Sequence, residues 1–176
     1  MLHFPLGIGE ITHVAFNPTS TILVVTGRDG FAVGELKKIL KATGSFQIFT
    51  SRERHAHLAW QPDGAAFAVA LFDSSVRLHR PTGELSRELL GLVHQEGPMT
   101  SVAFSPNGRY LAFGGGWWEE RGFALVVEYP SFAQVRDYGT RANQIGSLLF
   151  TQEHTLLIGS ADGTLTCCDV RQVAPL

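Results

Sequence analysis

The sequence has few cysteines and no long apolar run, and each absence excludes a class of protein. Its 176 residues include only two cysteines, Cys167 and Cys168. Neighbouring residues on a strand point to opposite faces, so these two are poorly placed to form a disulfide, and a reducing compartment is expected. No apolar run approaches the roughly 20 residues of a membrane-spanning helix, and the N-terminus does not resemble a signal peptide. We therefore expect a soluble cytoplasmic protein that does not enter a membrane.

An excess of charge is also missing. The formal net charge is −2, from 14 basic and 16 acidic residues. This balance gives no electrostatic basis for binding nucleic acid or an anionic membrane surface. The one dense basic cluster, formed by Lys37, Lys38 and Lys41, is expected to be a solvated edge.

Motifs that carry common enzyme chemistry are absent as well. The chain has no phosphate-binding loop, no zinc-type spacing of cysteine and histidine, no Gly-x-Ser-x-Gly elbow and no His-Glu-x-x-His helix. We therefore expect no enzyme, no catalytic residue, no cofactor and no metal site. The composition, with 44% hydrophobic and 17% charged residues, is that of a globular protein rather than a disordered one.

What the sequence does contain is a repeated strand–turn–strand unit. Its clearest copy runs from Val102 to Phe113, with Ser-Pro-Asn-Gly as the turn. The aromatic residues that end the first strand of each copy lie 44, 44 and 46 residues apart, and they are Phe16, Trp60, Phe104 and Phe150. A period of roughly 40–45 residues with four short strands per unit is typical of a β-propeller blade. We predict an all-β propeller with four antiparallel blades in a single domain over residues 1–176.

Blade boundaries follow from this period. The blades are predicted at about 10–52, 53–97, 98–142 and 143–172, with residues 2–9 left over as a closing strand. The last blade has only a few residues after Asp169 in which to build its outer strand. Within the first blade, Leu36, Ile39 and Leu40 have the spacing of a helical turn, but the repeat frame favours strand and loop, which we take as the prediction.

These segments resemble the WD-repeat β-propeller family. The resemblance is carried by Val-Ala-Phe-Ser-Pro-Asn-Gly at 102–108 and by Gly-Ser-Ala-Asp-Gly-Thr at 159–164, and it covers nearly the whole chain. The Trp-Asp dipeptide that names the family is missing from every repeat, so the repeats are degenerate. Three turn aspartates remain, and we expect Asp29, Asp73 and Asp162 to brace tight turns. By resemblance, the chain is expected to be a non-catalytic scaffold that presents its rim loops to other proteins.

Four blades leave the closure of the ring open. The chain could close alone as a four-bladed ring, be part of a longer or heteromeric assembly, or pair with a second copy into an eight-bladed ring. We favour the homodimer, because an open half-ring would expose two apolar blade faces. In that ring, residues 2–9 would complete the last blade of the partner by adding a strand to its edge.

Candidate binding residues cluster on one predicted rim. The third repeat carries an insertion near residues 118–121, where two tryptophans adjoin charged residues in the composition of a protein-binding hot spot. An alternative is that the tryptophans pack on a neighbouring blade or on the dimer seam. The predicted rim residues are Trp117, Trp118, Glu119, Glu120, Arg121, Arg52, Arg54 and His55.

A second hypothesis places a polar or metal site in the central channel, as in a ligand-binding or enzymatic propeller. His13 and His57 occupy equivalent positions in the first two repeats, where the later repeats have Ser101 and Ser147. Four histidines of a dimer could then approach the channel and bind a metal ion. The alternative is that each histidine bonds within its own blade.

Overall fold

The computed structural model describes residues 3–41, 45–90, 97–118, 120–139 and 143–171. These residues form four separate antiparallel sheets, in which consecutive strands are neighbours. The first sheet contains β1 (Ile11–Phe16), β2 (Ile22–Gly27), β3 (Gly30–Glu35) and β4 (Gln47–Thr50). The second contains β5 (His55–Trp60), β6 (Phe67–Leu71), β7 (Val76–His79) and β8 (Leu85–Leu89).

The third and fourth sheets follow the same plan. The third contains β9 (Met99–Phe104), β10 (Tyr110–Gly116), β11 (Gly122–Glu128) and β12 (Ala133–Gly139). The fourth contains β13 (Ile145–Phe150), β14 (Thr155–Ser160) and β15 (Leu165–Asp169), so it has three strands among the described residues. The all-β prediction with four antiparallel sheets is confirmed, and the sheets are consistent with propeller blades.

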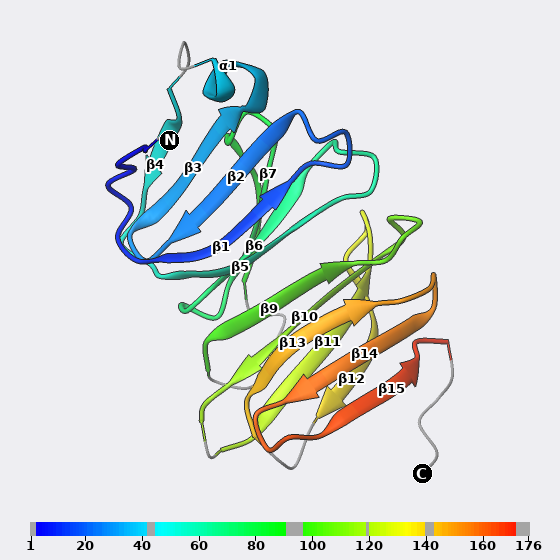
Figure 1. Cartoon of the computed structure of the whole chain (residues 1–176). Coiled ribbons are helices and arrows are strands. Elements are labelled where there is room, and N and C mark those ends of the chain that lie inside the picture. The colour runs from blue at the N-terminus through cyan, green and yellow to red at the C-terminus, as the bar shows by residue number, and fades with distance from the viewer. Residues whose placement is uncertain (1–2, 42–44, 91–96, 119, 140–142, 172–176) are drawn as a thin grey trace.

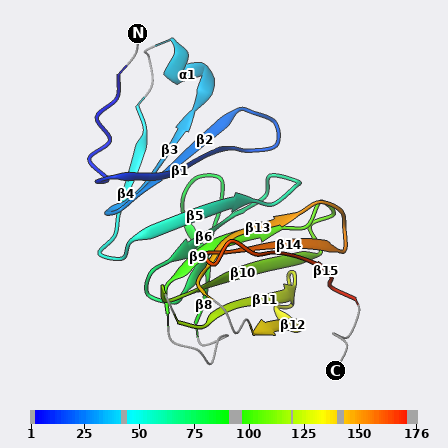
Figure 2. The ribbon, with the colours of Figure 1, turned by 60° about the horizontal axis from the view of Figure 1, so that its bottom comes forward.

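The sheets are arranged around their first strands. β1 contacts β5, β5 contacts β9, and β9 contacts β13, so the inner strands lie side by side while the other strands fan outward (Figures 1 and 2). Three buried clusters separate the sheets, one between each successive pair. No such cluster among the described residues joins the first sheet to the fourth.

The strand–turn–strand unit forms because its turn satisfies its own backbone. Ser105 Oγ accepts a hydrogen bond from the Tyr110 amide at 2.9 Å, and Asn107 Oδ1 accepts one from the Arg109 amide at 3.0 Å. Gly108 has a φ of 70°, a left-handed conformation that glycine adopts without steric cost. The turn therefore aligns β9 with β10 in a fixed register.

One short helix departs from the sequence prediction. Residues 36–40 were predicted as strand and loop, but they form α1 (Leu36–Leu40), which covers the outer end of β3. Ile39 is buried there, close to the Gly34 position of β3. The prediction was wrong because the repeat frame was given more weight than the helical spacing of the apolar residues.

The N-terminal segment lies on the first sheet. Residues 3–10 contain no strand, and Leu6 and Ile8 pack against Val25 and Ala32 on the face turned away from the second sheet. The single chain therefore does not place this segment at the fourth sheet. Its predicted role as the closing strand of a partner's blade stays a prediction.

Candidate protein-interaction surfaces

Equivalent positions in the four repeats define two faces of every blade. The leading face is the one turned toward the next blade in the sequence, and the trailing face is turned toward the preceding blade. In the first three blades the leading faces are apolar and covered by the next sheet. Their equivalent residues are Ala15, Val24, Phe31 and Val33 in the first blade, Ala59, Ala68, Val76 and Leu78 in the second, and Ala103, Ala112, Ala124 and Val126 in the third.

Among the described residues, no sheet covers the leading face of the fourth blade. The strand registers place Leu149, Leu157, Leu165 and Cys167 at the same four positions. Leu149 is 56% exposed and Leu165 is 70% exposed, although their counterparts in the first three blades are buried or half-buried. This surface, called here the leading end, is a blade face built for burial and left open.

The trailing face of the first blade also exposes residues that are covered in the other blades. In the later blades, Leu58 and Trp60, Val102 and Phe104, and Leu148 and Phe150 pack against the preceding sheet. The equivalent residues of the first blade are Val14 and Phe16, which are 51% and 46% exposed. The surface formed by these two residues and the N-terminal segment is called here the trailing end.

The predicted rim lies on one edge of the blades, called here the loop edge. Met99 at the start of β9 pairs with Gly115 near the end of β10. The segment that precedes the first strand of a blade therefore lies on the same edge as the loop that follows its second strand. This edge holds residues 51–54, 72–75, 117–118 and 120–121. Arg54 connects it to the first blade, because its guanidinium lies 4.8 Å from the centre of the Phe72 ring and 4.0 Å from the Glu10 carboxylate.

The tryptophan loop lies on this edge between β10 and β11. Trp117 and Trp118 are exposed, the latter by 63%, and Glu120 and Arg121 are exposed beside them, whereas Glu119 lies outside the described residues. The base of the loop is held by the fourth blade, since Gln144 Nε2 donates to the Gly116 carbonyl at 2.8 Å. The loop therefore presents two large aromatic side chains to solvent from an anchored base.

Not every predicted rim residue reaches the surface. Arg52 and Arg54 are exposed, but His55 is buried and lies beside Phe31 of the first blade. Burial lowers the pKa of His55 to about 4, so the ring is neutral at physiological pH. The prediction that His55 belongs to the rim surface was wrong, because a β-bulge between His55 and His57 turns His55 inward.

The turn aspartates differ in what they hold. The Asp73 carboxylate accepts hydrogen bonds from the Ser75 amide and from Arg77, both at 3.0 Å. Asp162 accepts one from the Thr164 amide at 2.9 Å, and its hydrogen bond from the Thr164 side chain lowers its pKa. Asp29 pairs with the neighbouring Arg28 side chain at 3.1 Å. The Asp73 and Asp162 carboxylates thus brace their turns, whereas the Asp29 carboxylate pairs with the Arg28 side chain.

His13 of the first blade and His57 of the second lie against each other with their rings tilted by 50°. The rings of His13 and His57 have their centres 4.1 Å apart, and burial lowers the pKa of both. His57 Nδ1 accepts a long hydrogen bond, 3.4 Å, from the Val102 amide of the third blade. Ser101 acts in the same way toward Leu148, whose amide lies 3.0 Å from its Oγ. The described residues contain no group of three side chains that could hold a metal ion. The hydrogen bond of His57 to the Val102 amide instead links the second blade to the third.

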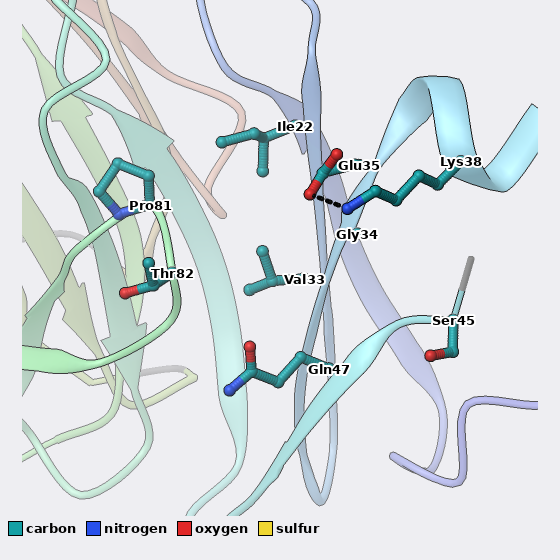
Figure 3. A pocket seen from close by; sticks show the side chains of 9 residues that line it. All are labelled: Ile22, Val33, Gly34, Glu35, Lys38, Ser45, Gln47, Pro81 and Thr82. Carbon is teal, nitrogen blue, oxygen red and sulfur yellow. Dashed lines mark hydrogen bonds and ion pairs between the residues drawn. The ribbon is translucent and has the colours of Figure 1, made fainter. Parts of the chain in front are cut away.

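A separate groove opens at the opposite edge, beside α1. It encloses about 280 Å³ between the outer end of the first sheet and the Pro81–Thr82 turn of the second (Figure 3). Lys38 and Glu35 face it and form an ion pair at 2.6 Å, and both side chains are more than half exposed. The groove is therefore open to water, and its charged lining is already paired.

Comparison with known families agrees with the repeat pattern. The model of the WD domain, G-beta repeat, matches residues 5–33 and 87–117. This match confirms the resemblance to WD repeats at two places, and the four antiparallel sheets are consistent with the blades of that family. A search of curated proteins finds no match to the chain. Within the described part of the chain, no helix is long and apolar enough to cross a membrane.

Proposed function

We propose that this WD-repeat chain is a non-catalytic protein-interaction scaffold of the cytoplasm, which works as an eight-bladed ring of two copies. WD repeats generally serve as scaffolds for other proteins, and the family is generally non-enzymatic. The loop edge, with its exposed aromatic and charged side chains, is the surface offered to a partner.

The leading end and the trailing end are the main support for the two-copy ring. In the first three blades, the residues equivalent to the leading end are covered by the next blade. In the last three blades, the residues equivalent to the trailing end pack against the preceding blade. A leading end therefore fits a trailing end by the same packing that joins the first blade to the second. Within one chain these ends lie on the first and fourth blades, so a second copy can satisfy both at once under two-fold symmetry.

The solution mass tests the ring. Light scattering on a sizing column should give twice the 19.2 kDa mass of the chain, and this mass should persist on dilution into the micromolar range. A compact particle of one chain would refute the ring, and a mass that rises without limit would indicate open head-to-tail polymers instead.

Changes in the tryptophan loop test whether the protein binds a partner through it. A photoreactive amino acid at position 118 should covalently capture the partner, which can then be identified and produced alone. Trp118→Ala should weaken its binding by about 30-fold or more, as expected of an aromatic hot spot, and change the unfolding free energy by less than about 0.5 kcal/mol. Equal binding by Trp118→Ala and the unchanged protein would refute the role of the loop.

Leu40→Ala is a matched control for this experiment. Leu40 is 65% exposed, like Trp118, but it lies at the end of α1 on the opposite edge. It should leave binding of the partner unchanged. If both variants weaken binding equally, the loop is not the specific contact.

A further inference from the structure

A cavity of about 400 Å³ lies between the outer strands of the first two blades. Its walls come from β3 and β4 of the first blade and from β7 and β8 of the second, and the start of β5 also lines it. We propose that this cavity binds the guanidinium group of an arginine side chain from a partner protein. The proposal rests on the proposed scaffold function only in taking its ligand from a partner.

Two histidines of the second blade stand where the repeat plan has apolar residues. His55 and His79 line the cavity and are only 1% and 5% exposed. The strand registers place Met99 and Val127 at the equivalent positions of the third blade, where both are buried. A blade of this chain therefore packs with apolar residues at both positions, so folding alone does not require the histidines.

Each of these histidines has a buried ring nitrogen that finds no hydrogen-bond partner among the described residues. The two nitrogens are His55 Nδ1 and His79 Nε2. His79 Nδ1 lies 2.9 Å from the Gly83 carbonyl, which can only accept a hydrogen bond, so Nδ1 carries the proton. Burial lowers the pKa of His79, so the ring is neutral and Nε2 keeps a free lone pair. Because a buried acceptor is costly when it stays unpaired, a fitting ligand brings N–H donors.

The charges around the cavity favour a cation. Arg77 lines the cavity, and its guanidinium is already held by Asp73 at 3.0 Å and by Glu88 at 2.5 Å. Glu84 adds a further carboxylate to the lining and is exposed. The carboxylates of these residues outnumber the one guanidinium, so the local charge is negative and attracts a positively charged ligand.

An aromatic wall stands beside the unpaired nitrogens. The rings of Phe31 and Phe49 stack with their centres 4.6 Å apart, and the Phe31 ring lies 4.7 Å from the His79 ring. Phe49 is half-buried and also contacts the Gly83 turn, so its ring is the side chain that a ligand displaces to reach Nε2. A guanidinium is planar, stacks on aromatic faces and carries five N–H donors, so it suits both the wall and the acceptors.

The position of the cavity favours a side chain of a docked protein. Ser51 both lines the cavity and belongs to the loop edge, and Thr50 lines it beside Ser51. The cavity therefore reaches the edge that is proposed to receive a partner. A protein bound on the loop edge could insert one arginine side chain between the first two blades.

A short blocked peptide tests this proposal. The probe is a tripeptide with arginine between two glycines, and the same peptide with citrulline keeps the shape but removes the charge. Isothermal titration should show binding of the arginine peptide, with an affinity about 10-fold or more above that of the citrulline peptide. His55→Met combined with His79→Val gives the second blade the residues of the third, and it should weaken binding of the arginine peptide by a similar factor of about 10.

Two further variants complete the experiment. Glu84→Gln changes an exposed side chain, so it should keep the fold and weaken binding of the arginine peptide about 2- to 5-fold. His154→Leu is the matched control. His154 Nδ1 is also buried with no hydrogen-bond partner in the described part of the chain, but this residue lies beside the Tyr110 ring of the third blade. The control should bind the arginine peptide like the unchanged protein.

Each outcome bears on one part of the proposal. Equal affinity for the arginine and citrulline peptides would overturn the cationic ligand, and full binding by the double variant would overturn the role of the two histidines. Binding of free ethylguanidinium without binding of the peptide would overturn a partner's side chain as the source. If neither probe binds, the cavity is not a site. None of these results changes the two-chain mass or the capture at position 118, so failure of this site is distinct from failure of the scaffold.

Discussion

Replacing Leu149 by aspartate should dissociate the two-chain ring. Leu149 is 56% exposed in the single chain, so about half of its apolar surface remains to be buried at a seam. Complete burial of a leucine side chain contributes about 1.5–3 kcal/mol, so this half contributes about 0.8–1.7 kcal/mol. Two-fold symmetry repeats the loss at both seams, which gives about 1.6–3.4 kcal/mol, or a dissociation constant raised about 15- to 270-fold. Burying the aspartate charge adds to this effect.

Sedimentation velocity over a range of concentrations measures the change, and Leu85→Asp is its control. Leu85 is 55% exposed and also lies on a strand, but β8 is the outer strand of the second blade and faces no seam. We expect Leu149→Asp to sediment as one chain at concentrations where Leu85→Asp and the unchanged protein sediment as two. Circular dichroism should show the same strand content in all three.

Two results would refute this reasoning. If Leu149→Asp and Leu85→Asp dissociate to the same extent, the substitution acts through general instability and not through a seam. If both remain two-chain particles with unchanged affinity, the copies associate through another surface.

Two further predictions concern the blades themselves. Burial lowers the pKa of His55 to about 4, so the stability that its neutral ring contributes is present above about pH 6.5 and is lost as the pH falls toward 4. His55→Leu should therefore remove about 2 kcal/mol of the difference in unfolding free energy between pH 7 and pH 5, and an unchanged difference in urea titrations would contradict this. Phe113→Ala should cost about 3–5 kcal/mol in the same titrations, because Phe113 is fully buried between the second and third blades, and a cost below about 1 kcal/mol would contradict that packing.

The repeat period was sufficient to predict the strands. The aromatic anchors end β1, β5, β9 and β13 as expected. The period succeeds because each blade repeats the same demand for small residues on the inner strand and large ones between sheets.

The same period hid two local features. α1 depends on Ile39 packing beside Gly34, a contact specific to the first blade, so alignment of repeats could not reveal it. His55 was assigned to the rim as part of a loop with Arg52 and Arg54, whereas β5 begins at His55 and a bulge turns its side chain inward. Its equivalents Met99 and Ile145 are buried apolar residues, and this comparison was the available signal for an inward position.

The candidate interaction surfaces could be predicted only in part from the sequence. Two adjacent tryptophans in an insertion indicate an exposed loop or a packed one, and the sequence does not choose between them; the structure leaves both side chains exposed. The open ends were predicted as a consequence of having four blades, but their residues required the strand registers. Leu149 and Leu165 look like any core leucine until their equivalents in covered blades are identified.

The tryptophan loop occurs in the third blade alone, and this asymmetry sets the valency of the proposed ring. Two copies related by a two-fold axis would display two such loops on the same edge, on opposite sides of the central channel. A partner with two recognition segments could bind both, and its second contact would form at the high effective concentration set by its own linker. A weak individual contact would then suffice for firm attachment, provided that the partner is itself paired or repeated.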